Sequence, residues 1–150
     1  MDAMDFFRGL AEARRTIERE RALRQRREER RRDLGCKLHE HVSSSGKAGS
    51  YDRFDQYIDE DAEADVAERE AHRELDRGRA VFDGMRRLGG KVADGACVAE
   101  FVYADGSTFS EAADALCVSL STARRDFAVA RDWLDANGIA HAMEGTGTAE

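Results

Sequence analysis

Residues Thr108 to Leu134, TFSEAADALCVSLSTARRDFAVARDWL, decide the fold of the C-terminal part of this chain. Thr108 lies three positions before Glu111, which is the spacing of a capping box, in which each side chain accepts a hydrogen bond from the other residue's backbone amide. A first helix is therefore expected to begin at Phe109 and to end near Leu116.

A tight turn and a second helix are expected to follow. Residues 117–120 form the turn, in which Val118 is predicted to be an apolar plug between the two helices. Ser119 is placed to cap the second helix, which then begins at about Leu120. The buried side of this helix is predicted from apolar residues at spacings of four, three and four: Ala123, Phe127, Ala130 and Leu134.

Polar residues on the other sides of the second helix are the candidate binding residues. Two short helices around a tight turn form a helix-turn-helix, which commonly enters the DNA major groove. Arginine can pair with guanine or clamp a phosphate, and hydroxyl groups can contact either. The alternative is an ordinary solvated helix face. The predicted DNA-binding residues are Ser119, Ser121, Thr122, Arg124, Arg125 and Arg131.

The same segment resembles a known family. Residues 110–127, SEAADALCVSLSTARRDF, are similar to region four of sigma-70-type RNA polymerase sigma factors, and AVARDWL at 128–134 resembles the end of that region. The resemblance implies binding to double-stranded promoter DNA through the helix that contains Arg124 and Arg125, with RNA polymerase as a candidate partner. Cys117 stands where the family usually has the turn glycine. No region two is recognisable upstream, so a complete sigma factor is not expected.

The whole chain is predicted to be all-α. Long N-terminal helices form a coiled-coil-like helical hairpin, and a three-helix domain with the helix-turn-helix follows. The expected organisation is a charged helix over 1–42, a flexible Ser/Gly linker over 43–50, a second long helix over 51–88, the DNA-binding domain over 91–143 and a disordered tail over 144–150.

The first long helix has a short apolar seam. From Arg24 to Asp33 the seam has ended, so this part of the helix is expected to be solvated. The seam consists of Phe6, Leu10, Ala13 and Ile17, at spacings of four, three and four.

The second long helix is predicted to carry a seam of its own. Gly78 and Gly84 are expected to weaken the helix and to favour a kink or fraying. A further buried helix, about 94–103, is expected to lead to a turn at Asp105 and Gly106 and to complete the three-helix domain. The seam of the second long helix is Ala71, Leu75, Gly78, Phe82 and Met85.

The order of these elements resembles small bacteriophage transcriptional regulators of the ArpU and RinA kind. That resemblance implies a phage or prophage origin and control of late or packaging genes. The long helices are expected to join two copies of the chain as a homodimer.

Charge argues against strong DNA binding by one chain. The chain has 24 Lys and Arg and 31 Asp and Glu, a formal net charge of −7. Residues 1–33 carry 11 basic and 8 acidic side chains and are net basic. Residues 51–79 carry 5 basic and 11 acidic side chains, and residues 91–143 carry 4 basic and 8 acidic ones, so both of these segments are net acidic. Binding should then depend on a small positive face, in which Asp126 and Asp132 oppose the three arginines. A chain that is paired with a second copy, or held by RNA polymerase, is expected to bind DNA with higher affinity than a single chain.

Other chemistry has little support in the sequence. Cys36, His39 and His41 lack the further ligand that a zinc site needs, so no metal and no cofactor is expected. No phosphate-binding loop or nucleophile pattern occurs, which favours a protein that is not an enzyme. Three unpatterned cysteines and the lack of a signal or membrane-spanning segment predict a cytoplasmic protein.

Three functional hypotheses remain. The first is a DNA-binding transcriptional regulator. The second is a DNA-packaging or assembly protein similar to a small terminase subunit, and the third is a coiled-coil interaction protein with a degenerate helix-turn-helix. A monomer or dimer favours the first, a ring of eight or more copies the second, and a failure to bind DNA the third.

Overall fold

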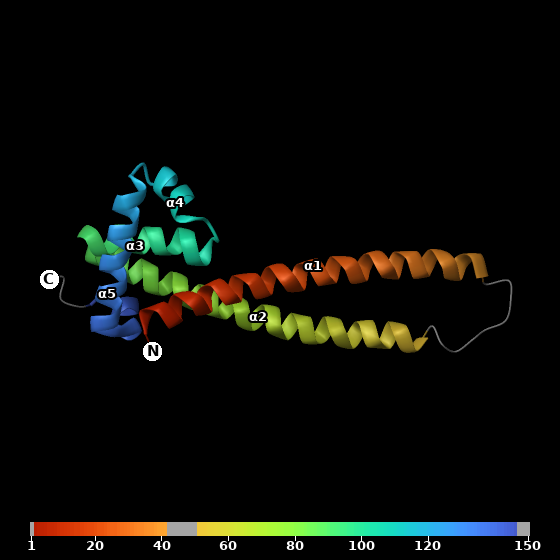
Figure 1. Ribbon diagram of the computed structural model, residues 1–150. Helices are drawn as coiled ribbons and strands as arrows, with labels where there is room; N and C mark the ends of the chain where they lie inside the picture. The colour runs from red at the N-terminus through yellow and green to blue at the C-terminus, as the bar shows by residue number, and fades with distance from the viewer. Residues whose placement is uncertain (1, 42–50, 147–150) are drawn as a thin grey trace. The chain divides into compact units, whose positions relative to one another are not determined.

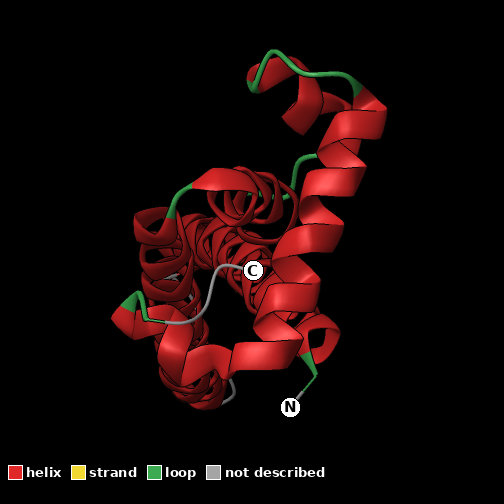
Figure 2. Ribbon diagram, turned by 90° about the vertical axis from the view of Figure 1, so that its left-hand side faces the viewer, coloured by secondary structure: helices red, strands yellow, loops and turns green. Residues whose placement is uncertain are grey.

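The computed structural model describes the backbone of residues 2–41 and 51–146 and the side chains of residues 2–35 and 56–146. The predicted linker at 43–50 and the last four residues of the predicted tail lie outside the described residues. Within those ranges every regular element is helical, and the predicted all-α class is confirmed (Figures 1 and 2). The elements are α1 (Ala3–His41), α2 (Tyr51–Leu88), α3 (Gly90–Ala99), the π-helix η2 (Glu100–Ala104), α4 (Phe109–Ala115) and α5 (Leu120–Glu144).

The chain divides into two compact units. One consists of Arg15–Ala71 and is called here the hairpin unit. The other combines Met1–Arg14 with His72–Glu150 and is called the C-terminal unit. The C-terminal unit is therefore built from more of the chain than residues 91–143, because it includes the first part of α1 and the last part of α2.

The core of the C-terminal unit is rich in aromatic rings. Phe7 is fully buried, and its ring lies 6.3 Å from that of Phe82, 5.1 Å from Tyr103 and 5.3 Å from Phe127. The backbone amide of Ala3 donates a hydrogen bond of 2.7 Å to the Asp135 carboxylate of α5. The beginning of α1 is thus part of the core that supports α5.

Both predicted seams of the long helices are confirmed as buried. The prediction that Gly78 and Gly84 would kink or fray α2 is wrong, because α2 is continuous through both. A Cβ atom on Gly78 would lie 2.4 Å from Leu10, and one on Gly84 would lie 1.6 Å from the carbonyl oxygen of Ala142. Both glycines allow another segment to approach closely, and that packing stabilises the helix despite their low helix propensity.

The helix predicted at 94–103 is present in two parts. It begins at Gly90 as α3 and continues as the π-helix η2 to Ala104. α3 crosses α5 at Gly95, where a Cβ atom would lie 2.0 Å from the carbonyl oxygen of Asp126 and 2.6 Å from Cβ of Ala130. This small-residue crossing brings the backbone of α5 close to α3 and fixes the position of the helix that carries the candidate arginines.

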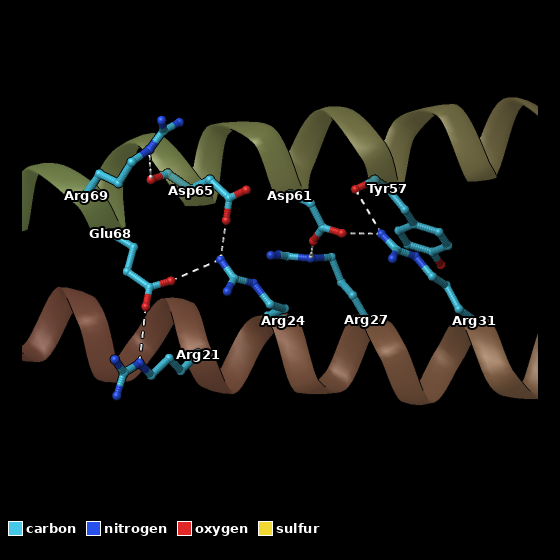
Figure 3. Close-up of polar contacts among 9 residues, drawn as sticks. All are labelled: Arg21, Arg24, Arg27, Arg31, Tyr57, Asp61, Asp65, Glu68 and Arg69. Carbon is cyan, nitrogen blue, oxygen red and sulfur yellow. Dashed lines mark hydrogen bonds and ion pairs between the residues drawn. The ribbon is translucent and has the colours of Figure 1, made fainter.

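The hairpin unit corrects the prediction that residues 24–33 of α1 are solvated. Here α1 and α2 lie side by side and antiparallel, and arginines of α1 pair with carboxylates of α2 (Figure 3). Arg27 Nε is 2.7 Å from Asp61 Oδ1, and the Arg27 side chain is only 11% exposed. The pairs of this arginine–carboxylate ladder are Arg21 with Glu68, Arg24 with Asp65 and Glu68, and Arg27 and Arg31 with Asp61.

The charge of the ladder fixes the ionisation state of Asp61. Burial raises the pKa of the Asp61 carboxyl, but the hydrogen bonds and positive charges of Arg31 and Arg27 outweigh burial, and the pKa lies below its ordinary value. Because the arginines and Asp61 are partly buried together, the pairing replaces the apolar contact that this part of the hairpin lacks.

Candidate nucleic-acid interface

The first helix of the predicted motif begins as expected. The backbone amide of Thr108 donates a 2.7 Å hydrogen bond to the Glu111 carboxylate, and the Glu111 amide donates one of 3.2 Å to the Thr108 hydroxyl. These two bonds confirm the capping box and the start at Phe109. The hydrogen bonds from the Thr108 backbone and side chain hold the pKa of Glu111 below its ordinary value.

The turn between α4 and α5 is closed by backbone hydrogen bonds. The amide of Cys117 donates to the carbonyl of Asp114 at 3.1 Å, and that of Val118 donates to the carbonyl of Ala113 at 3.0 Å. This pair of bonds is a Schellman motif, and Cys117 has the left-handed conformation (φ 55°) that the motif requires. The family glycine that Cys117 replaces would therefore occupy a left-handed position here.

The predicted role of Val118 as a plug is wrong, because its side chain is 37% exposed. Buried alanines fill the space between the helices instead. Ala113 of α4 and Ala123 of α5 are buried, and the ring of Phe109 meets that of Phe127 edge to face at 5.3 Å. Small residues thus let α4 and α5 pack closely.

The second helix also begins where predicted, at Leu120. Ser119 is its N-cap, and the Ser119 hydroxyl accepts a 3.1 Å hydrogen bond from the Thr122 amide. Hydroxyl contacts of 2.8 Å to Thr122 and 3.0 Å to Ser121 join the three predicted polar residues into one group. Ser119 and Ser121 are exposed and Thr122 is half-buried.

Arg124 and Arg125 occupy the first half of α5 and are exposed. Within the side chains that the structure describes, neither has an ion pair or a side-chain hydrogen bond. Arg131, the third predicted arginine, differs, because its guanidinium lies 2.6 Å and 2.9 Å from Asp132 Oδ1. The hydrogen bonds that Arg131 donates to Asp132, followed by the charge of Asp132, raise the pKa of Arg131. The structure thus separates two available arginines from one that is already paired.

Asp126 does not oppose the arginines as the sequence suggested. It is only 3% exposed, and its carboxylate lies 3.2 Å from Nζ of Lys91 at the beginning of α3. The hydrogen bond to Asp126, then the one to Asp94, raises the pKa of Lys91. Asp126 lies three positions after Ala123 and four before Ala130, both buried, and this spacing could have identified it as an inward residue.

The predicted buried side of α5 is confirmed at all four positions, and Trp133 is buried as well. α5 extends beyond the motif to Glu144, with non-helical backbone angles at Gly138. Its last turn includes Ala142, the residue that Gly84 contacts. The helix with the candidate arginines is therefore held in the core along much of its length.

The family model of ECF sigma factors matches residues 1–138. This chain belongs to the ECF sigma factor family. Membership supports a sigma-factor-like, DNA-binding regulatory role and implies DNA and RNA polymerase as the molecules with which the protein interacts. The sigma-like sequence pattern covers only the last third of the chain, whereas the family match begins at residue 1 and includes both long helices. Comparison with curated proteins and with solved structures finds no match.

The described residues form neither a metal-ligand cluster nor a membrane-spanning helix. Among the described side chains, no three His, Cys, Asp or Glu residues are grouped as metal ligands would be. The side chains of Cys36, His39 and His41 lie outside that set. None of the helices in the described part of the chain is long and apolar enough to cross a membrane.

Proposed function

We propose that the protein is a transcriptional regulator that binds double-stranded DNA through the first half of α5. The observation that carries the proposal is the pair Arg124 and Arg125, which is exposed on the second helix of a capped helix-turn-helix and has no acidic partner among the described residues. Asp126, the nearest carboxylate in sequence, is buried against Lys91.

The chemistry of this surface suits a DNA strand. A guanidinium can donate two parallel hydrogen bonds to guanine O6 and N7, or clamp a phosphate. The Ser121 and Thr122 hydroxyls lie near the N-terminus of α5, where backbone amides and the helix dipole favour a phosphate. We assign base or phosphate contact to Arg124 and Arg125, and phosphate positioning to Ser119, Ser121 and Thr122. Arg131 contributes only where a phosphate displaces Asp132.

Two available arginines give modest affinity. Each neutralised phosphate contributes about −0.9 to the slope of log K against log salt, so two contacts per chain predict a slope of about −2. The net charge of −7 adds long-range repulsion. We therefore propose that the regulator acts when paired or when held by RNA polymerase. A phage or prophage origin, and a role without catalysis, stay predictions from sequence.

The test is a fluorescence anisotropy titration of labelled promoter-pool DNA at several salt concentrations. Arg124→Ala or Arg125→Ala should weaken specific binding by about 1 to 3 kcal/mol if the arginine reads a base. Arg79→Ala is the matched control, because Arg79 is an exposed arginine on α2 of the same unit, 3.9 Å from Asp76. Binding that is unchanged in both α5 variants would refute the assignment of this surface.

A further inference from the structure

One face of the hairpin unit carries two rows of opposite charge. The two rows follow heptad-like spacings of four, three and four on α1, and three, four and three on α2, so each row lies along one side of its helix. The basic row on α1 is Arg19, Leu23, Arg26 and Arg30, and the acidic row on α2 is Glu60, Glu63, Ala67 and Glu70.

A shallow hollow shows that both rows border the same face. The hollow, of about 290 Å³, is lined by Glu20 and Arg27 of α1 and by residues 60, 63, 64 and 67 of α2. Leu23 lies three positions after Glu20 and four before Arg27, so it lies beside the hollow. The acidic row itself supplies three of the lining residues.

Most members of both rows are available for a partner. The exceptions are Arg19, whose Nε lies 3.4 Å from Oε1 of Glu20 on the same helix, and Glu60, which accepts a 3.1 Å hydrogen bond from Gln56. Leu23 is 38% exposed, and the arginines at 26 and 30 are exposed and form no ion pair within the described part of the chain. The carboxylates of Glu63 and Glu70 are likewise exposed and have no basic partner there. The ladder accounts for Arg21, Arg24, Arg27 and Arg31, and within the described side chains no arginine of the basic row forms an ion pair with α2.

The register of the hairpin relates the two rows to each other. Arg21 is level with Glu68, Arg24 with Asp65 and Arg27 with Asp61, as their ion pairs show (Figure 3). Extending this antiparallel register places each member of the basic row level with one member of the acidic row. The levels are Arg19 with Glu70, Leu23 with Ala67, Arg26 with Glu63, and Arg30 with Glu60.

We propose that a second copy of the chain docks on this face, hairpin on hairpin, about a two-fold axis parallel to the helices. Rotation about that axis keeps each residue at the same height along the helices and exchanges the lateral positions of α1 and α2. In the dimer, α1 of each copy therefore lies on α2 of the other. Every arginine of the basic row then meets a glutamate of the second copy. Leu23 of each copy enters the hollow of the other, above the small side chains of Ala64 and Ala67.

The charges select this arrangement over its competitors. A two-fold axis perpendicular to the helices in the plane of the hairpin would place α1 on α1, with arginine against arginine, and like charges in contact are destabilising. A nucleic acid on the basic row would lie beside the glutamates of the acidic row, which repel phosphate. Only a partner that carries both signs in the same register satisfies both rows.

Sedimentation equilibrium tests the proposal with two charge-reversal variants. The full-length chain has a mass of 16.7 kDa, and wild type should sediment at twice that value with a dissociation constant that rises with salt. Arg26→Glu with Arg30→Glu, and separately Glu60→Arg with Glu63→Arg, should each weaken the dimer about tenfold or more. An equimolar mixture of the two variants should recover a dimer, because each α1 then meets a complementary α2.

The control is Arg124→Glu with Arg125→Glu, which reverses two exposed arginines outside the hairpin unit. It should keep the wild-type dimer while it abolishes DNA binding, so the dimer surface and the DNA surface are tested separately. A monomeric wild type at tens of micromolar, an assembly of eight or more copies, or a mixture that fails to recover the dimer overturns the proposal. Wild-type affinity in both charge-reversal variants also overturns it. A basic-row variant that loses DNA binding but keeps the dimer would instead assign the row to nucleic acid.

Discussion

Replacing Cys117 by glycine should stabilise the helix-turn-helix. Cys117 adopts φ 55° at the turn between α4 and α5, where its amide and that of Val118 close the Schellman motif. In this left-handed region the Cβ atom of an ordinary residue crowds the backbone, whereas glycine has no Cβ. The Cys117 side chain is exposed, so its removal costs no buried contact.

The size of the effect follows from two opposing terms. Relief of the left-handed strain is worth about 1 to 2 kcal/mol. The greater conformational freedom of glycine in the unfolded chain lowers the free energy of unfolding by about 0.5 to 1 kcal/mol. The two ranges leave a net gain of about 0 to 1.5 kcal/mol, and its middle value of about 0.75 kcal/mol corresponds to a rise in Tm of about 1.5 to 3 °C for a chain of this size.

Urea unfolding monitored by tryptophan fluorescence measures this gain. Trp133 is the single tryptophan of the chain and is buried on α5, so it reports the unfolding of the unit that contains the turn. Cys117→Ala is the control, because it removes the thiol but keeps the Cβ atom. If the glycine variant is no more stable than the alanine variant, the Cβ atom does not strain this turn and the reasoning fails.

Two further predictions concern packing and pH. Gly84→Ala should destabilise the C-terminal unit by several kcal/mol in a thermal melt, because the new Cβ atom would lie 1.6 Å from the carbonyl oxygen of Ala142. Gly9→Ala in α1, where nothing lies within 4 Å of the new atom, should instead stabilise the helix by about 0.5 to 1 kcal/mol, and equal effects of both variants would contradict the close approach at Gly84. Because the pKa of Asp61 is lowered by folding, its stabilising effect should be complete well above pH 3.8 and be lost as the pH falls through the lower folded value. The stabilities of wild type and Asp61→Asn, measured by unfolding followed with helical circular dichroism, should therefore converge on acidification. A stability difference that stays constant down to pH 2 would refute the effect of the ladder.

The caps of the helix-turn-helix could be predicted because their signals are local. Thr108 with Glu111, and Ser119 with Thr122, bond across three residues of the same segment, so spacing alone indicates them. The buried positions of α5 follow from helical periodicity in the same way. The exposure of Val118 could not be predicted from its polarity, because the close packing of α4 and α5 through alanines leaves no space between them for a larger side chain.

The arginine–carboxylate ladder could not be predicted from the periodicity of apolar residues, because its contacts are made by charged side chains. From Arg24 onward α1 has few apolar residues, and without a partner this part of the helix resembles a solvated one. The opposite net charges of the two segments indicate this pairing, since residues 1–33 are net basic and residues 51–79 are net acidic. Two antiparallel helices of opposite charge joined by a short linker are expected to pair through their charged faces.

The role of each charge in this protein depends on its position on a helix more than on the net charge of the segment. Residues 91–143 are net acidic, yet Asp126 is neutralised inside by Lys91 and Arg131 by its neighbour Asp132, which leaves Arg124 and Arg125 as an exposed positive pair. Counting charges underestimates this surface, because a buried, paired carboxylate contributes little field at the exposed side of α5. Weak electrostatic attraction at long range and a small, well-placed positive pair at short range together favour a protein that binds DNA with the help of a partner.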